Sequence, residues 1–151
     1  MLFNITEASM FHKIKIFPSY LILIAKTLGL LIVMQMVLYT RSYQDAVRLA
    51  TYLGKIRFSR TNQNPQRYAG RVSKIVSGSA KFVPYTTCLP QALVAKILLD
   101  QAHIANQLQA GFIYNENNEL KGHAWLLHGN QVVIGGDVNN FVPMSIFENV
   151  P

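Results

Sequence analysis

The longest apolar stretch of the 151-residue chain covers residues 16–40 and carries one charge, Lys26. A membrane-spanning helix needs about 20 predominantly apolar residues, but the longest uncharged run here is residues 27–40. A lysine near the centre of a span costs about 2.5–3.5 kcal/mol, and Pro18 and Gly29 also weaken one continuous span. The pattern favours one or two helices packed in the domain core, with an interfacial helix and a spanning helix as the alternatives.

Three further segments show the spacing or the end signals of helices. Residues 42–56 begin with Ser42 three positions before Asp45, which is a capping-box-like start. Residues 67–77 are predicted to form a basic helix with one solvated face. Residues 88–102 have apolar positions over a wide arc and few polar ones, which predicts a largely buried helix.

Short strand-like runs replace helical patterns in the last third of the chain, at residues 108–114, 122–128 and 131–135. The order predicts an α+β fold, in which N-terminal helices are followed by a buried helix packed on an antiparallel sheet. At this length we expect one compact domain, with a basic, mostly helical region at residues 1–81 and the core of the fold at residues 82–151.

Charge is divided unevenly between these two regions. Residues 1–81 carry 12 Lys+Arg against Glu7 and Asp45, a net charge of +10, whereas residues 82–151 carry two lysines against five acids, a net charge of −3. A basic region suits an acidic peptide, an anionic membrane surface or nucleic acid. Nucleic acid is the least favoured, because no stacking aromatic motif accompanies the basic residues.

Cys88 is the only cysteine, so the chain has neither an internal disulfide nor a metal site built on several thiolates. Thr87 is a suitable N-cap and Pro90 is tolerated in a first helical turn, which places Cys88 at the first helical position. The free N–H groups and the helix dipole favour a thiolate there. The alternative is a small, buried, inert side chain.

His123 opens the second strand-like run, and a tight turn at residues 129–130 would bring the third run back beside it. With a two-residue turn, His123 would face Gly136, whereas a three-residue loop or one bulge at Gly135-Gly136 would place Asp137 opposite His123. A thiol at a helix start, this imidazole and this carboxylate together make a Cys-His-Asp triad. The alternatives are a structural histidine on the strand and a loop aspartate that caps backbone amides.

The segments CLPQALVAKILLDQAHI and GHAWLLHGNQVVIGG, with a strand between them, resemble the transglutaminase-like domain of lasso-peptide maturation proteases. In that family a Cys opens a helix of the form C-L-x-x-A-L-x-x-x-x-L-L, and an H-A-W strand and a Gly-rich hairpin with the Asp follow. The resemblance covers about residues 82–140 and departs from the pattern at Pro90 and at residues 103–105. The matching residues are Cys88, Leu89, Ala92, Leu93, Leu98 and Leu99 in the helix and His123, Ala124 and Trp125 in the strand.

The resemblance implies a bacterial cysteine peptidase that removes the leader peptide from a ribosomally made lasso-peptide precursor, without a cofactor or metal. It implies Cys88 as nucleophile, His123 as general base and Asp137 as the residue that orients the histidine. Because residues 1–81 lack the strand-rich pattern of the precursor-binding domain that some members carry, it implies the stand-alone form. That form works with a separate leader-binding protein and an ATP-dependent macrolactam synthetase, which predicts a cytoplasmic protein. The basic charge of residues 1–81 adds the expectation that this region docks a leader peptide, its carrier protein or the inner membrane surface.

The triad alone does not decide which acceptor takes the acyl group. Water gives a peptidase, whereas an amine gives an acyltransferase or transglutaminase. A third hypothesis, of another class, is a non-catalytic, membrane-associated assembly protein, in which Cys88 belongs to the core and residues 1–81 form the functional surface.

Overall fold

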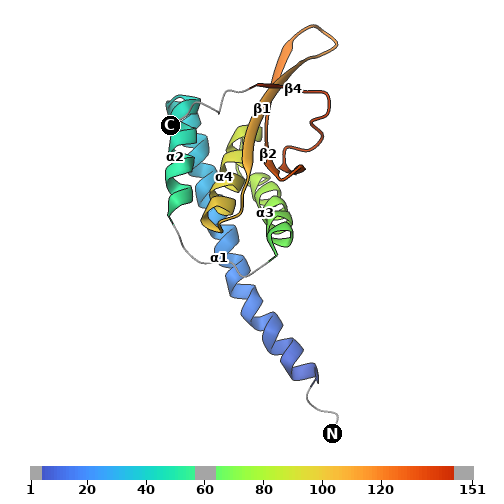
Figure 1. Ribbon diagram of the computed structural model, residues 1–151. Helices are drawn as coiled ribbons and strands as arrows, with labels where there is room; N and C mark the ends of the chain where they lie inside the picture. Colours follow the sequence, from blue (N-terminus) through green and yellow to red (C-terminus); the bar gives the residue numbers. More distant parts are fainter. Residues whose placement is uncertain (1–4, 57–63, 145–151) are drawn as a thin grey trace.

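The computed structural model describes residues 5–56 and 64–144, and side chains from residue 19 onward. Four helices precede a four-stranded antiparallel sheet with the strand order β3-β2-β1-β4 (Figure 1). This confirms the predicted α+β class. The elements are α1 (Ile5–Thr40), α2 (Tyr43–Lys55), α3 (Pro65–Ala80), α4 (Cys88–Gln101), β1 (Gln107–Tyr114), β2 (Leu120–His128), β3 (Gln131–Ile134) and β4 (Val142–Met144).

Helix α1 is one continuous helix of 36 residues that passes through both Pro18 and Gly29. Its N-terminal part extends away from the body of the molecule, and only its C-terminal part runs beside the other helices (Figure 1). The residues that it buries there, Thr27, Leu31 and Met34, follow helical spacing along one side. The prediction of a core helix therefore holds for one face of α1 and is wrong for the other.

Local capping explains where α2 and α3 begin. The Ser42 side chain accepts a hydrogen bond from the backbone N–H of Asp45, as the sequence predicts. Helix α3 begins two residues earlier than predicted, because the Asn64 side chain accepts from the N–H groups of Gln66 and Arg67 and Pro65 occupies the first turn.

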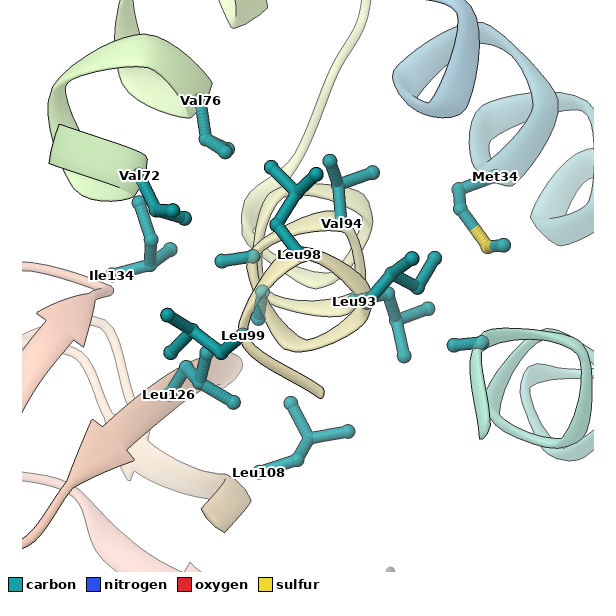
Figure 2. Close-up of a cluster of buried hydrophobic side chains, with 14 of the residues drawn as sticks. Met34, Val72, Val76, Leu93, Val94, Leu98, Leu99, Leu108, Leu126 and Ile134 are labelled. Atoms are coloured by element: carbon teal, nitrogen blue, oxygen red, sulfur yellow. The ribbon is translucent and has the colours of Figure 1, made fainter. Parts of the chain in front are cut away.

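Helix α4 lies at the centre of the fold, between the other three helices and the sheet (Figure 2). Leu93, Ile97 and Leu99 are fully buried, and each such side chain stabilises the fold by about 1.5–3 kcal/mol through loss of apolar surface from water. The surrounding side chains in Figure 2 include Met34 of α1, Val72 and Val76 of α3, and Leu108, Leu126 and Ile134 of the sheet. This packing fixes the position of the first turn of α4.

The sheet is the predicted meander with one strand added. The turn after β2 pairs His128 with Gln131, but the bulge falls between Leu126 and Leu127, whose partners are Ile134 and Val132. Both expected routes, a three-residue loop and a bulge at Gly135-Gly136, are therefore wrong. Those two glycines instead end β3, with φ angles of 123° and 67° that leave the extended region. Strand β4, which the sequence did not predict, pairs with β1 on the opposite edge.

Candidate active site

Cys88 occupies the first position of α4, as the sequence predicts. Its N-cap residue, Thr87, has an extended backbone, with φ −94° and ψ −175°, but its side chain makes no capping hydrogen bond. The Thr87 side chain therefore leaves the N–H groups of the first turn uncapped, and the positive end of the helix dipole lies at the same place. The half-buried thiol of Cys88 lies beside these N–H groups.

Cys88 and His123 line the same cavity, of about 350 Å³, where the start of α4 meets β1 and β2. We call it the thiol cavity. Most of its wall is apolar and includes one residue of α2 and one of β4, so five elements of the fold line it. The other residues that line it are Tyr43, Leu89, Ala110, Gly111, Phe112, Leu120, Gly122, Ala124 and Met144.

The imidazole of His123 is held by a backbone carbonyl. Its Nε2 lies 2.6 Å from the carbonyl oxygen of Gly135. A carbonyl only accepts hydrogen bonds, so Nε2 must carry the proton and donate it. In the neutral ring Nδ1 then keeps its lone pair, which is the state that a general base requires.

Aromatic rings pack around the same imidazole. The ring centroid of Phe141 lies 5.0 Å from that of His123, and the Trp125 ring lies 6.1 Å away in a stacked arrangement. Trp125 is itself buried and fixed, because its indole N–H donates to the Gln109 side chain at 3.0 Å. These contacts restrict the orientations open to His123.

Asp137 is exposed, and its carboxylate accepts a hydrogen bond from the backbone N–H of Asn139 at 3.1 Å. This is the loop-capping geometry that the sequence left open as an alternative. Continuation of the β2–β3 ladder beyond Ile134 would bring Asp137 opposite His123. The ladder ends before that point, and the structure shows Gly135 as the partner of the imidazole. The role of Asp137 as third triad member stays a prediction.

Three residues near the histidine escaped the sequence reasoning: Gln109, Gly135 and Phe141. The Gly-Gly pair was a visible signal, but it suggested a bulge and not a carbonyl oxygen that accepts a hydrogen bond from the imidazole. No pattern in the sequence around Phe141 predicts its contact with His123, because the loop that follows β3 brings the two rings together. Within the described ranges, no group of three or more His, Cys, Asp or Glu side chains is placed to hold a metal ion.

Residues 31–145 match the protein family described as the transglutaminase-like superfamily. The matched segment begins within α1, covers α2 to β4, and contains Cys88, His123 and Asp137. Comparisons with curated proteins and with solved structures give no significant match.

Proposed function

The chain belongs to the transglutaminase-like superfamily, and on that premise we propose that it is a cysteine peptidase that removes the leader peptide from a lasso-peptide precursor. The observation that carries the proposal is the shared thiol cavity of Cys88 and His123. A thiol at a helix start, an imidazole with a defined tautomer and free N–H groups are the parts that thiol-based acyl chemistry needs.

In the proposed mechanism, Nδ1 of His123 takes the proton from Cys88, and Sγ attacks the carbonyl carbon of the scissile peptide bond. The backbone N–H of Cys88 stabilises the resulting oxyanion. The imidazolium, held by the Gly135 carbonyl through Nε2, returns its proton to the leaving amine, and a thioester remains. Water then attacks the thioester, His123 accepts a proton from it, and the leader is released as a carboxylate with the thiol restored.

The choice of a lasso-peptide precursor as substrate depends on the sequence resemblance over about residues 82–140. On the same resemblance, we propose that the protein acts in the cytoplasm together with a separate leader-binding protein and a macrolactam synthetase. We propose Asp137 as a further residue that supports the imidazolium, although its carboxylate caps Asn139 in this structure. The apolar wall of the thiol cavity suits an apolar side chain of the precursor close to the cleaved bond.

The peptidase proposal is tested with the cognate precursor and its partner proteins, followed by mass spectrometry of the products. Loss of the leader mass supports hydrolysis, and loss of this activity in Cys88→Ala assigns it to the thiol. Precursor maturation that persists in Cys88→Ala contradicts the proposal and favours the non-catalytic assembly protein.

A second measurement needs no substrate, because Cys88 is the only cysteine and any thiol alkylation reports on it alone. Iodoacetamide should react with the wild type at least about tenfold faster than with His123→Ala, since in the proposed mechanism the imidazole takes the thiol proton. The matched control is His103→Asn, which changes an exposed histidine with φ 58° to a residue that tolerates that backbone. Equal rates in all three proteins contradict a Cys88–His123 pair.

Acyl transfer to an amine is the second candidate, and the nearly apolar wall of the thiol cavity favours it because such a wall limits water around a thioester. The mass measurement separates the two functions. A product heavier than the precursor by the mass of an added amine, with ammonia lost, indicates transfer and excludes simple hydrolysis as the main reaction.

A further inference from the structure

The outer face of α1 leaves a continuous apolar surface without a protein partner in the described part of the chain. The most apolar part of residues 19–40 has a mean hydropathy of 2.3, yet only 17% of that part is buried. We call the exposed residues the outer stripe. They are Leu21, Ile22, Ala25, Gly29, Ile32, Val33, Met36 and Tyr39. Contiguous apolar patches of this kind usually mark an interaction site on a soluble protein.

The polar residues of the same helix segment turn toward the domain and away from the outer stripe. The Lys26 ammonium donates to the Gln101 side chain of α4, and the Gln35 amide donates to the Tyr85 carbonyl oxygen at 3.2 Å. The Thr27 hydroxyl is buried and donates to the carbonyl of Leu23 within the helix. Lys26 is the single charged residue between Ser19 and Thr40, so the outer stripe is uncharged.

A membrane-spanning role does not fit the way α1 is packed. At 1.5 Å per residue, residues 19–40 would be about 33 Å long, enough for a bilayer core of about 30 Å. However, α3 and α4 pack along this segment, from the Arg71 guanidinium, 5.8 Å from the Tyr20 ring centroid, to the Tyr85 backbone beside Gln35. A helix flanked by its own domain over this length can meet a membrane only side-on.

Positive charge borders the outer stripe. Arg71 lies on the Tyr20 ring, and Lys74 lines a shallow apolar groove between α1 and α3 together with Ile24 and Leu28. Phe82, at the end of the same groove, is 80% exposed. An apolar helix face bordered by cations and aromatic rings matches the boundary between acyl chains and anionic headgroups.

We propose that the outer stripe docks the protein in the plane of an anionic lipid bilayer, with Arg71 and Lys74 at the headgroups. The proposal concerns a surface outside the thiol cavity, and the first half of the stripe precedes the family match at residue 31. It does not depend on the proposed peptidase activity.

A second copy of the chain is the rival occupant. Ala25 and Gly29 are four residues apart, a spacing that lets two helices approach closely in a membrane. In water, however, self-association through the stripe offers Arg71 and Lys74 no acidic partner, because the stripe itself is uncharged. The same charges attract an anionic bilayer, which is why we assign the stripe to lipid.

The experiment is co-sedimentation of the full chain with vesicles of phosphatidylcholine and phosphatidylglycerol, and with vesicles of phosphatidylcholine alone. We expect clear binding to the anionic vesicles, and weaker binding to the neutral ones and at high salt. The variant Ile22→Glu/Ile32→Glu should bind about a hundredfold more weakly, because two apolar side chains no longer enter the lipid. Both positions are exposed, at 68% and 50%, so the fold should survive, as circular dichroism will show.

The matched control is Tyr114→Glu/Leu120→Glu, which places two glutamates at exposed apolar positions, paired across β1 and β2 at the far end of the sheet. It should bind anionic vesicles like the wild type. Arg71→Gln/Lys74→Gln should lower the preference for anionic over neutral vesicles several-fold. Cys88→Ala should bind unchanged, which separates docking from catalysis.

Three outcomes would overturn the proposal. The first is a folded wild type that binds neither kind of vesicle. The second is equal loss of binding in the stripe variant and in the control. The third is a stable dimer, seen by analytical ultracentrifugation without lipid, that Ile22→Glu/Ile32→Glu dissociates; this result would assign the stripe to a second copy.

Discussion

The thiol cavity and the outer stripe of α1 are both apolar surfaces, but they differ in shape and in what surrounds them. The cavity is concave, closed by residues from α2, α4, β1, β2 and β4, and holds Cys88 and His123. The stripe lies along one side of a single helix and is bordered by Arg71 and Lys74. A concave apolar wall beside a thiol and an imidazole suits a small part of a peptide, whereas a long apolar face with cations along one flank suits an extended anionic surface.

The difference also shows how the net charge of +7 should be understood. The excess lies in residues 1–81, which contribute the stripe and its border, whereas the residues from 82 onward that build most of the cavity carry a net negative charge. We therefore associate the positive charge with the proposed docking and not with the chemistry proposed at the thiol. The predictions below separate the two surfaces.

The largest effect is expected from Cys88→Ala. Removal of the nucleophile should lower precursor cleavage by about a thousandfold or more, while the free energy of unfolding changes little because the residue is half-buried and alanine suits a helix start sterically. Cleavage is measured by mass spectrometry and stability by urea unfolding. A cleavage rate within tenfold of the wild type would remove Cys88 from the reaction.

Gly135→Ala should disturb the support of His123. A Cβ at Gly135 would lie 2.3 Å from the Cβ of Trp125, at a φ of 123° that side chains rarely adopt. We expect a loss of about 3 kcal/mol in the free energy of unfolding and a fall in thiol reactivity, since the Gly135 carbonyl must move. The matched control is Gly136→Ala, with φ 67° and no heavy atom within 4 Å of the added Cβ. It should cost only about 1–2 kcal/mol, and an equal cost in both variants would contradict the steric explanation.

Gly122→Leu should fill the thiol cavity without straining the fold. Gly122 lines the cavity, and nothing lies within 4 Å of a Cβ added there. We expect kcat/KM to fall about tenfold for precursors with a large apolar residue at the cavity, and less for alanine at that position. Gly122→Ala serves as the control, because it also replaces the glycine backbone but adds only a methyl group to the cavity. A uniform fall for all precursors would mean that the cavity does not contact the selected side chain.

Lys26→Met should give the smallest effect. Burial lowers the pKa of Lys26 below its ordinary value of 10.5. Between the lowered pKa and 10.5 the unfolded chain binds more protons than the folded one, so this residue makes the free energy of unfolding rise with pH over that window. Urea unfolding of the wild type and Lys26→Met at pH values raised toward 10.5 should show a steeper rise of the free energy of unfolding in the wild type. If the free energy of unfolding changes with pH in the same way in both proteins, burial does not penalise the charge of Lys26. Binding to anionic vesicles should be retained in Lys26→Met, because Lys26 faces Gln101.

Local signals gave much of the fold from the sequence alone. Ser42 with Asp45 marked the start of α2, and Thr87 with Pro90 placed Cys88 at the first position of α4. Each signal depends on hydrogen bonds and backbone preferences within one helical turn, so a short stretch of sequence is enough to predict it. The same holds for the turn that pairs His128 with Gln131.

Features that depend on distant contacts could not be read in this way. The three residues of β4 have no pattern of their own and form a strand because β1 offers an open edge. The bulge lies at the Leu126–Leu127 step and not at the glycines, since the packing of Leu126 and Ile134 on α4 sets the register of β3.

For the candidate site, the sequence determined which groups we propose for the chemistry: one thiol at a helix start and one histidine on a strand. Only the tertiary structure decided that they share an apolar cavity, that a Gly135 carbonyl holds the imidazole, and that Asp137 caps Asn139. Likewise, the sequence made residues 16–40 apolar, but packing decided which side faces the domain. The physical reason is common to both: residue type and spacing fix local chemistry, whereas burial and hydrogen-bond partners depend on segments far apart in the chain.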